Sequence, residues 1–450
     1  MKYDVIICGG GPSGICAAVS AKRNQAKVLL IETSGLLGGA NVLSLVGPLM
    51  TFHNLEGQII KGIGEEIVSR LVAKGYSSGH RPDPIGFCAS VTPFDVEGLK
   101  EVYFDLIREE KIDLLLHAAV CDVLTGDDEI TALKIATKSG IVEAAAKIYI
   151  DATGDGDVAA FSGCEYFFGR RGDNLTQPMT MLFTVANIDF SRLREYQKQH
   201  PEDFYNGKTA TLDYLGLSGF FRKIEEARRL GDFNIPRDRV LLFENVIRGE
   251  ATINISRVLN YSGVDPFALT QAEIEGRKQI KEAFNFLKKY IPGFENSFIT
   301  KTPYQIGVRE TRHILGAYLL QKDDIISERS FADAIALSAF PIDIHSPDGS
   351  SLDTAGQIKT YEIPLGVMIP RGPSNLIVTG RAVSATHEAS ASLRVTPTVM
   401  ALGQAAGVLA AYSALKGILP VNAEYPEIAK LLKKGHAVFK KEDVSNRKFP

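Results

Sequence analysis

Basic side chains that could bind and protonate a small molecule recur near the end of the chain. His387 is followed by Glu388, and Arg394 stands just before a proline-led apolar segment. An arginine fork binds a carboxylate through two parallel hydrogen bonds, and a histidine exchanges protons near neutral pH. These residues predict a site that anchors a small polar molecule and moves a proton. The structural alternatives are a phosphate or helix-end contact for Arg394 and a hydrogen bond to Glu388 or the backbone for His387.

Two further candidates come from earlier segments. Asp343 and His345 would share one face of a strand, where the aspartate could orient the histidine as an acid or base; a loop contact is the alternative. Arg309 and Arg312 would share one face of a helix, from which they would reach a substrate or bridge two domains. Three positions would either line the site or belong to the core: Gln177, Thr180 and Met181.

The overall composition narrows the class of protein. The chain has 450 residues, 45% of them hydrophobic, and a net charge of −3, so it can bury a large core and offers no basic stripe for nucleic acid or a membrane surface. The five cysteines are scattered without a C-x-x-C, and the candidate histidines lack a second ligand at helical spacing, so we expect no metal site. The N-terminus shows no signal-like segment, and residues 399–415 favour a buried helix over a membrane span. We expect a cytoplasmic protein.

The elements that would position these residues begin with a nucleotide-binding pattern at the N-terminus. A strand over residues 5–7 leads into a G-x-G-x-x-G turn, and a second strand over residues 28–31 ends at Glu32. The turn and the start of its helix contain Gly9, Gly11, Pro12, Ser13 and Gly14. Backbone N–H groups there can bind a pyrophosphate, and Glu32 can accept hydrogen bonds from both ribose hydroxyls. The pattern predicts a dinucleotide site without choosing between NAD and FAD.

Hydrophobic periodicity predicts alternating strands and helices around this site and a more charged, mixed region in the middle of the chain. We expect helices over residues 59–74, 95–110, 190–200, 219–230 and 271–290. We expect strands over residues 113–120, 129–137, 141–146, 147–150, 179–185 and 375–380. Thr396 suits the N-cap and Pro397 the first position of a later helix.

Three further glycine-containing segments indicate which dinucleotide is bound. Gly38 and Gly39 follow the acid, and the corners at 152–154 and 380–381 each follow a strand. Together with the first turn they resemble two-dinucleotide-binding-domain flavoproteins of the fumarate reductase and succinate dehydrogenase type, and within these the FAD-dependent oxidoreductase family. The most specific matches are G-V-R-E-T-R at 307–312, I-D-I-H at 342–345, G-R-x-x-S-A-T-H-E-A at 380–389 and R-V-x-P-T-x-M-A-L-G-Q-A-A-G at 394–407. The resemblance covers nearly the whole chain.

The resemblance implies an α/β fold in which a Rossmann-like FAD-binding domain holds an inserted mixed α+β substrate or cap domain. The expected boundaries are 1–166 and 354–420 for the FAD-binding domain, 167–353 for the insert, and 421–450 for a C-terminal helix and tail with a frayed end. The residues expected to contact FAD are Gly9, Gly11, Pro12, Ser13, Gly14, Glu32, Thr33, Gly38, Gly39, Ala40, Val120, Ala152, Thr153, Gly154, Asp155, Gly380, Arg381, Pro397 and Thr398.

The resemblance also gives expectations for the cofactor linkage. The helix that begins near Pro397 would aim free N–H groups and a partial positive charge at the flavin ring. Residues 40–42 stand where relatives with covalent flavin carry a histidine, and His53 lies too far along the chain. We therefore expect non-covalent FAD.

The expected activity is hydride transfer between flavin and a small polar substrate that bears a carboxylate or hydroxyl. His387 and Arg394 would correspond to a substrate-binding pair beside the ring, with His345 and Arg309 as further catalytic candidates. The electron acceptor is not identified, and a homo-oligomer is left open. The alternative function is a flavin-bearing electron-transfer subunit of a larger complex. A disulfide reductase-like flavoenzyme would need a C-x-x-x-x-C, which the chain lacks, and near-neutral charge disfavours a tRNA-modifying flavoprotein.

Overall fold

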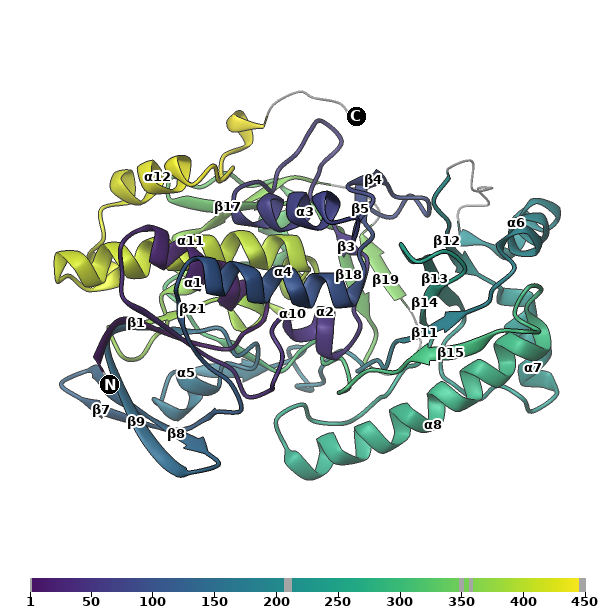
Figure 1. The fold of residues 1–450 in the computed structure, drawn as a ribbon, viewed down its shortest axis with the longest axis horizontal. Coiled ribbons are helices and arrows are strands. Elements are labelled where there is room, and N and C mark those ends of the chain that lie inside the picture. Colours follow the sequence, from purple (N-terminus) through teal and green to yellow (C-terminus); the bar gives the residue numbers. More distant parts are fainter. Residues whose placement is uncertain (1, 206–212, 348–351, 356–358, 445–450) are drawn as a thin grey trace.

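The computed structural model describes residues 2–205, 213–347, 352–355 and 359–444 and divides into two lobes (Figure 1). The larger lobe is built on a seven-stranded sheet with the order β6-β2-β1-β9-β8-β7, and β21 also pairs with β9. These strands are β1 (Lys2–Cys8), β2 (Val28–Ile31), β6 (Asp113–Leu115), β7 (Ala119–Gly126), β8 (Glu129–Thr137), β9 (Gly140–Asp151) and β21 (Leu376–Val378).

The register of the parallel strands brings their carboxyl ends to one edge of the sheet. Cys8 at the end of β1 pairs with Ile31 of β2 on one side and with Asp151 of β9 on the other, and Val378 of β21 also pairs with Asp151. In open α/β sheets, ligands bind beyond the carboxyl ends of the strands. The register therefore gathers at this edge the loops that follow these strands, which are the glycine-containing segments of the sequence.

Helices cover this sheet, and two of them pack closely against each other. They are α1 (Pro12–Arg23), α2 (Gly39–Leu43), α3 (Ile63–Ala73), α4 (Val96–Glu109), α5 (Asp157–Phe161), α11 (Thr396–Lys416) and α12 (Tyr425–Lys434). A Cβ on Gly403 of α11 would meet the backbone of Ser13, and one on Gly407 would meet that of Ala17, so glycine lets α11 touch α1. Within the described residues α11 is the helix long and apolar enough to span a membrane, and 83% of its most apolar stretch is buried in the protein. It is a core helix here.

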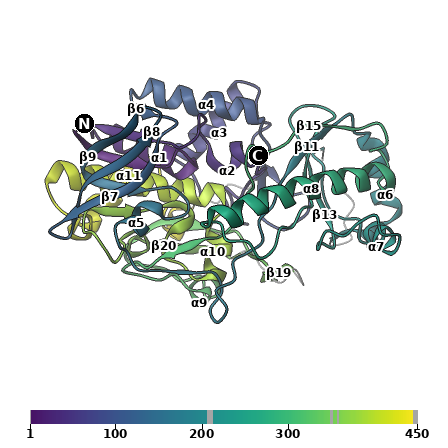
Figure 2. The same cartoon turned by 90° about the horizontal axis from the view of Figure 1, so that it is seen from below.

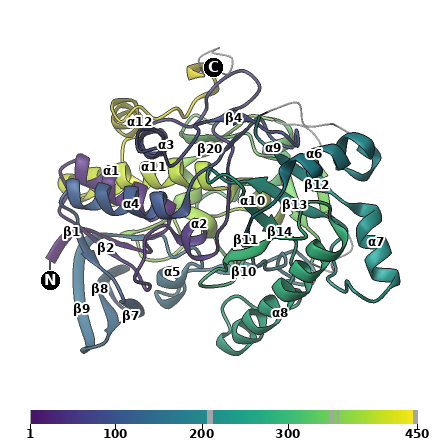
Figure 3. The ribbon, with the colours of Figure 1, turned by 45° about the vertical axis from the view of Figure 1, so that its right-hand side comes forward.

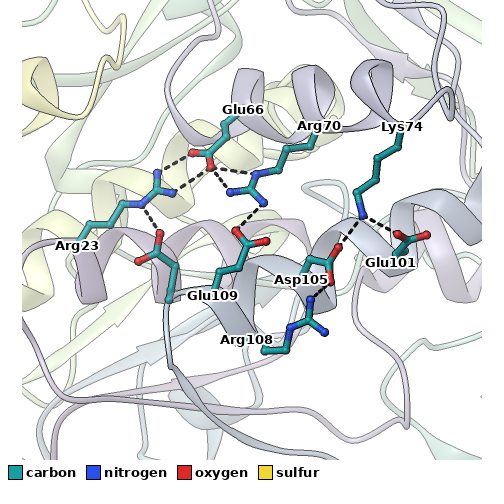
Figure 4. A network of polar contacts seen from close by, with 9 residues as sticks. Arg23, Glu66, Arg70, Lys74, Glu101, Asp105, Arg108 and Glu109 are labelled. Atoms are coloured by element: carbon teal, nitrogen blue, oxygen red, sulfur yellow. Dashed lines mark hydrogen bonds and ion pairs between the residues drawn. The ribbon is translucent and has the colours of Figure 1, made fainter.

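A network of ion pairs holds α1, α3 and α4 together on the outer face (Figure 4). Glu66 accepts hydrogen bonds from Arg23 (2.6 and 3.0 Å) and from Arg70 (3.0 and 3.1 Å), and Arg70 also reaches Glu109 at 2.8 Å. Lys74 extends the network to α4 through Glu101 and Asp105. These side chains are partly exposed, so the network fixes helix positions at modest energy.

The second lobe has its own antiparallel sheet, with the order β12-β13-β14-β11-β15. In Figures 1, 2 and 3 it lies at the end of the molecule opposite β7–β9. Its elements are β11 (Phe183–Ala186), β12 (Gly216–Gly219), β13 (Val240–Glu244), β14 (Ala251–Asn254), β15 (Phe298–Lys301), α6 (Phe190–Gln199), α7 (Phe221–Arg229) and α8 (Pro266–Tyr290). Its buried apolar residues form a separate core drawn from 179–306, whereas 314–342 pack in the core of the first lobe. The domain boundaries stay a prediction.

Short strand pairs and helices complete the described chain. They are β3 (Leu49–Met50), β4 (Arg81–Pro82), β5 (Ser90–Thr92), β10 (Tyr166–Phe168), β16 (Arg312–Ile314), β17 (Ala334–Ser338), β18 (Ile342–His345), β19 (Leu352–Ala355), β20 (Tyr361–Pro364), α9 (Lys322–Ile326) and α10 (His387–Leu393). The pairs are β10 with β16, β17 with β20 and β18 with β19, and β5 lies between β3 and β4.

Several predicted elements were wrong in extent. The single strand expected over 113–120 is two, because the chain turns at His117 (φ +52°) between β6 and β7. The strands expected over 141–146 and 147–150 are one, β9, which pairs with β8 through its first half and with β1 through its second. The helix expected from residue 59 starts only after Gly62 (φ +62°). The strand expected over 179–185 is shorter and forms β11. The helix expected from residue 271 is α8, which starts five residues earlier. The predicted frayed end falls largely outside the described residues.

Candidate functional site

The first glycine turn leaves the N-terminus of α1 open. Gly11 is the N-cap, no side chain caps the helix, and its first turn contains no acidic residue. A Cβ on Gly9 (φ +107°) would collide with the carbonyl of Ala152, so the first and third glycine-containing loops pack directly on each other. The first N–H groups of a helix have no acceptor within it. An uncapped, acid-free terminus of this kind suits a pyrophosphate.

The second glycine loop and the acid of β2 close around this turn. Gly38 N–H donates to the carbonyl of Gly10 at 2.8 Å, and a Cβ on Gly39 would lie 2.9 Å from the Cα of Gly11. Glu32 accepts from Gly10 N–H at Oε2 (2.7 Å), and from Ser34 N–H (2.7 Å) and Thr33 Oγ1 (3.0 Å) at Oε1. A carboxylate offers about four acceptor positions. The remaining position, on Oε2, leaves room for one ribose hydroxyl rather than the expected two.

The remaining predicted cofactor residues are spread along the same edge of the sheet. Thr379 Oγ1 lies 2.9 Å from Ser13 Oγ, which sets Gly380 against α1. The corner at 152–154 is held by Asp151, whose Oδ1 accepts from Thr153 N–H at 3.0 Å and from its hydroxyl at 2.7 Å. Ala40 lies in α2, next to Gly39. Val120 lies near the start of β7, paired with Ile135, two residues after Ala118, whose N–H donates to the carbonyl of Glu32 at 3.1 Å.

The N-terminus of α11 extends beyond that of α1. Because Gly403 faces Ser13 and Gly407 faces Ala17, the two helices run in the same direction, and α11 starts about 9 Å further out at 1.5 Å per residue. Val395 is the N-cap rather than the expected Thr396, whose hydroxyl instead donates to Asn41 of α2 at 3.3 Å. Neither an acid nor a side-chain cap occupies this terminus. Two open helix ends in succession fit an elongated cofactor whose pyrophosphate and ring carbonyl groups lie some distance apart, as in FAD.

Beside the start of α11 lies a cluster of buried and half-buried charged side chains, here called the cationic cluster. It consists of Arg237, Arg257, Arg309, Arg394, His345 and Asp343. Arg394 donates to Gln177 Oε1 (3.3 Å) and lies 3.8 Å from a carboxylate oxygen of Asp343. Arg309 donates to the carbonyl of Pro178 at 2.5 Å and to Thr180 Oγ1. The structure thus brings together three of the four predicted catalytic residues, and Arg309 and Arg312 do not share a helix.

The electrostatics of this cluster reflect burial among like charges. Desolvation, reinforced by Arg394 and Arg237, lowers the pKa of Arg309, and desolvation with Arg257 lowers the pKa of Arg237 to about 9. Desolvation and Arg309 lower the pKa of His345 to about 3. Guanidinium groups stay protonated at neutral pH, whereas His345 is neutral. Its Nε2 faces Asp343 at 3.3 Å and its Nδ1 faces Arg257 at 3.4 Å, so both ring nitrogens are engaged.

His387 belongs to an adjacent buried group centred on Glu310. Glu310 accepts hydrogen bonds from His387 Nδ1 (2.8 Å), His313 Nε2 (2.7 Å) and Gln177 N–H (2.8 Å). Glu388, the alternative partner weighed for His387, does not take this role. Despite desolvation, these bonds lower the pKa of Glu310, so it is ionised. His387 Nε2 is buried and has no hydrogen-bond partner among the described residues, so it is available to a ligand.

Two other basic residues of the motifs bind acids of the 152–157 loop. Arg381 donates to Asp155 Oδ1 at 2.5 Å and to the carbonyl of Val308 at 2.7 Å. Arg312 donates to Asp157 at 2.8 Å and lies in β16, so it joins this loop to the segment that carries Arg309. Within the described ranges, no group of three or more His, Cys, Asp or Glu side chains could hold a metal ion.

Sequence reasoning missed three residues of the site. Glu310 stands inside the G-V-R-E-T-R segment, next to Arg309, and its position within a matched motif was an available signal. Arg237 and Arg257 flank strands of the second lobe, far from every motif, and no local pattern marks them. Gln177, left open between site and core, links the two groups because its N–H binds Glu310 and its side chain binds Arg394.

Comparisons with known proteins identify the family of this chain. The model of the family described as FAD dependent oxidoreductase matches residues 4–432. The NADH:fumarate oxidoreductase of Klebsiella pneumoniae (strain 342) is 23% identical over 190 residues, which span 34% of this chain and 20% of that protein. The chain therefore matches only about a fifth of that relative's length.

Solved structures of low identity also align along most of the chain. A geranylgeranyl bacteriochlorophyll reductase-like protein from Thermoplasma acidophilum is 14% identical with a TM-score of 0.47, covering 98% of this chain and 84% of its own. An L-proline dehydrogenase from P. horikoshii is 12% identical with a TM-score of 0.44, covering 93% and 94%. The family match, which spans nearly the whole chain, carries the assignment. The protein belongs to the FAD dependent oxidoreductase family and is an enzyme that uses FAD.

Proposed function

We propose that this FAD-dependent oxidoreductase transfers a hydride between non-covalently bound flavin and a small substrate that carries a carboxylate. The observation that carries this proposal is the cationic cluster beside the uncapped N-terminus of α11. Bound FAD would supply a hydride acceptor or donor at its ring. The first-turn N–H groups of α1 would hold its pyrophosphate, Glu32 one ribose hydroxyl, and the α11 terminus the ring.

In this site Arg394 and Arg309 would bind the substrate carboxylate. Gln177 and Asp343 hold Arg394 in place. The carbonyl of Pro178 and the hydroxyl of Thr180 hold Arg309. Neither guanidinium therefore has to be ordered when the substrate binds. Preorganisation of this kind favours affinity and places the reacting carbon. His345, with both ring nitrogens engaged, would orient Asp343 and Arg257 rather than exchange a proton.

His387 would move the proton that accompanies hydride transfer. Because Glu310 accepts the proton-bearing Nδ1, Nε2 of a neutral His387 has a free lone pair. In the oxidative direction the substrate would lose a hydride to FAD and a hydroxyl proton to Nε2; in the reductive direction both would return. Glu310 would hold the tautomer and stabilise the imidazolium formed.

Anaerobic bleaching of the flavin absorbance by a panel of 2-hydroxy acids tests this function. We expect at least one acid to bleach the wild-type enzyme, and Arg394→Gln and His387→Gln to retain FAD while bleaching about 100-fold more slowly. Arg371→Gln is the matched control, because its side chain is 60% exposed on the surface. Bleaching of Arg394→Gln at the wild-type rate would contradict the proposal. The panel is also extended to amino acids and to simple alcohols, and a reaction with uncharged substrates alone would contradict the proposal as well.

A further inference from the structure

Gln177 carries a buried donor group that the function proposed above does not use. Its residue is 2% exposed, and its side-chain oxygen Oε1 faces two donors, an Arg394 guanidinium N–H at 3.3 Å and the backbone N–H of His345 at 3.5 Å. Because both of these groups donate, the amide atom that faces them has to be the oxygen. The amide nitrogen, Nε2, is buried and has no hydrogen-bond partner among the described residues.

One face of α10 carries further buried polar atoms of the same kind. His387 begins this helix, Ser390 lies one turn further on, and Arg394 is its C-cap, with its N–H still bonded to the carbonyl of Ser390 at 3.0 Å. Residues at this spacing share one helix face. His387 Nε2, Ser390 Oγ and Arg394 Nε are each buried without a hydrogen-bond partner in the described part of the chain.

These unpaired atoms indicate where a polar ligand binds. Buried polar side-chain atoms have a hydrogen-bond partner in the large majority of cases. Here three of them share a face of α10, and a fourth belongs to Gln177, which is bonded directly to Arg394 on that face. A ligand with its own acceptors and donors would supply the missing partners.

Gln177 also stands between the groups proposed to bind the carboxylate and the group proposed to take the proton. The 178–180 segment that follows it holds Arg309. Its own backbone N–H donates to Glu310 at 2.8 Å, and Glu310 in turn accepts from His387. The part of a small acid that would lie between these groups is the carbon next to its carboxylate, together with the substituent on that carbon.

We propose that Gln177 Nε2 donates a hydrogen bond to an oxygen on that carbon, so that the substrate is a 2-hydroxy acid, or a 2-oxo acid in the reductive direction, rather than a 2-amino acid. This inference rests on the proposed function for the carboxylate anchor. A hydroxyl can accept from Gln177 and donate to His387 Nε2 at the same time. When C–OH becomes C=O, the hydride leaves the carbon for FAD and the proton leaves the oxygen for His387. A protonated amine offers the Gln177 N–H groups no lone pair.

Binding of unreactive acids to the FAD-loaded enzyme, followed by the flavin spectrum, tests this contact. The probes are pairs with and without a 2-oxo group: pyruvate and propionate, 2-oxoglutarate and glutarate, phenylpyruvate and 3-phenylpropionate. We expect the 2-oxo acid of at least one pair to bind at least about tenfold more tightly, because its partner leaves a buried donor unsatisfied. No preference for the 2-oxo acid in any pair overturns the inference.

Turnover gives a second readout of the same contact. Lactate is compared with alanine, and 2-hydroxyglutarate with glutamate, by anaerobic bleaching of the flavin. We expect the hydroxy acid of a pair to bleach the enzyme at least about tenfold faster than the amino acid. Faster bleaching by the amino acid overturns the inference and leaves the carboxylate anchor standing.

Variants separate a contact with the substrate from a role in holding Arg394. Gln177→Glu keeps an oxygen for Arg394 and loses the N–H donors; its added charge weakens both acids of a pair, so the ratio within each pair is the readout. Gln177→Met removes the donors without adding charge. In both variants the preference for the 2-oxo acid should fall to about one, whereas Gln271→Glu, exposed on α8, should keep the wild-type ratio.

The outcomes distinguish this inference from the function on which it rests. A wild-type ratio in a Gln177 variant that folds and holds FAD would mean that Gln177 only positions Arg394, and it overturns the inference. Arg394→Gln should weaken both acids of every pair, and unchanged binding there contradicts the proposed function instead. A wild type that binds none of the probes overturns both.

Discussion

Replacing Glu310 by glutamine probes the buried group that holds His387. Glu310 accepts from His387, His313 and the backbone of Gln177 at 2.7–2.9 Å, and its side chain is fully buried. A glutamine keeps one acceptor oxygen and places an NH2 where the other oxygen stood. If that oxygen stays with the two histidines, the new NH2 group faces the N–H of Gln177. Both of these buried donors are then left without an acceptor.

The cost follows from the number of donors left without an acceptor. At about 1–3 kcal/mol for each buried unsatisfied donor, Glu310→Gln should lower the free energy of unfolding by about 2–6 kcal/mol at pH 7. Urea unfolding of the FAD-loaded protein measures it. Glu388→Gln is the matched control; as a half-buried residue in the first turn of α10 it should cost at most about 1 kcal/mol. A loss for Glu310→Gln no larger than that of Glu388→Gln would refute this account of the group.

The stability lost in Glu310→Gln should depend on pH in a definite direction. The pKa of Glu310 is lowered in the folded protein by its bonds to the histidines, so its ionised form stabilises the fold. That contribution is fully present above the unfolded pKa and disappears as the pH falls through the lowered folded pKa. The stability difference between wild type and Glu310→Gln should therefore be greatest near neutral pH and shrink in strong acid. A difference that grows on acidification would contradict this assignment.

Three further predictions test other parts of the fold. Gly39→Ala should weaken FAD binding at least about tenfold, because its Cβ would press on Gly11 Cα, and the FAD content of the purified protein reports this loss. Gly126→Ala, whose Cβ would make only an ordinary contact with Thr131 at 3.6 Å, should bind FAD normally. Burial raises the pKa of Asp151 to about 6, so the unfolding free energy should fall by about 2 kcal/mol as the pH rises from 4 to 7, and Asp151→Asn should remove most of that slope. Glu66→Gln should cost about 1–2 kcal/mol in low salt and less in 1 M NaCl, whereas Glu97→Gln should cost little; equal losses would contradict the network.

The nucleotide half of the site could be predicted because local sequence determines it. The second strand matches β2 at both ends, and the glycines of the first turn, the Gly38-Gly39 loop and Gly380 all lie at one edge of the sheet. Each of these features depends on a few adjacent residues whose side chains, or lack of them, the turn itself requires.

The proposed substrate half of the site could be predicted only in part, because it depends on long-range packing. Arg394 and His345 were identified from motifs, but their contacts with Gln177 and Arg257 join segments far apart in the chain. His387 was identified without its true partner, since Glu310 is remote in sequence and Glu388 is adjacent. Arg237 and Arg257 lie in a lobe without recognisable motifs, so only the folded structure places them beside the others.

The most direct test of the account is a crystal structure of the protein with bound FAD. We expect the pyrophosphate at the first turn of α1, between Gly11 and Gly39, and the flavin ring at the N-terminus of α11 with Arg394 and His387 facing it. A ring bound away from α11, or separated from Arg394 by intervening protein, would contradict the central claim that the cationic cluster is the substrate site of this flavoenzyme.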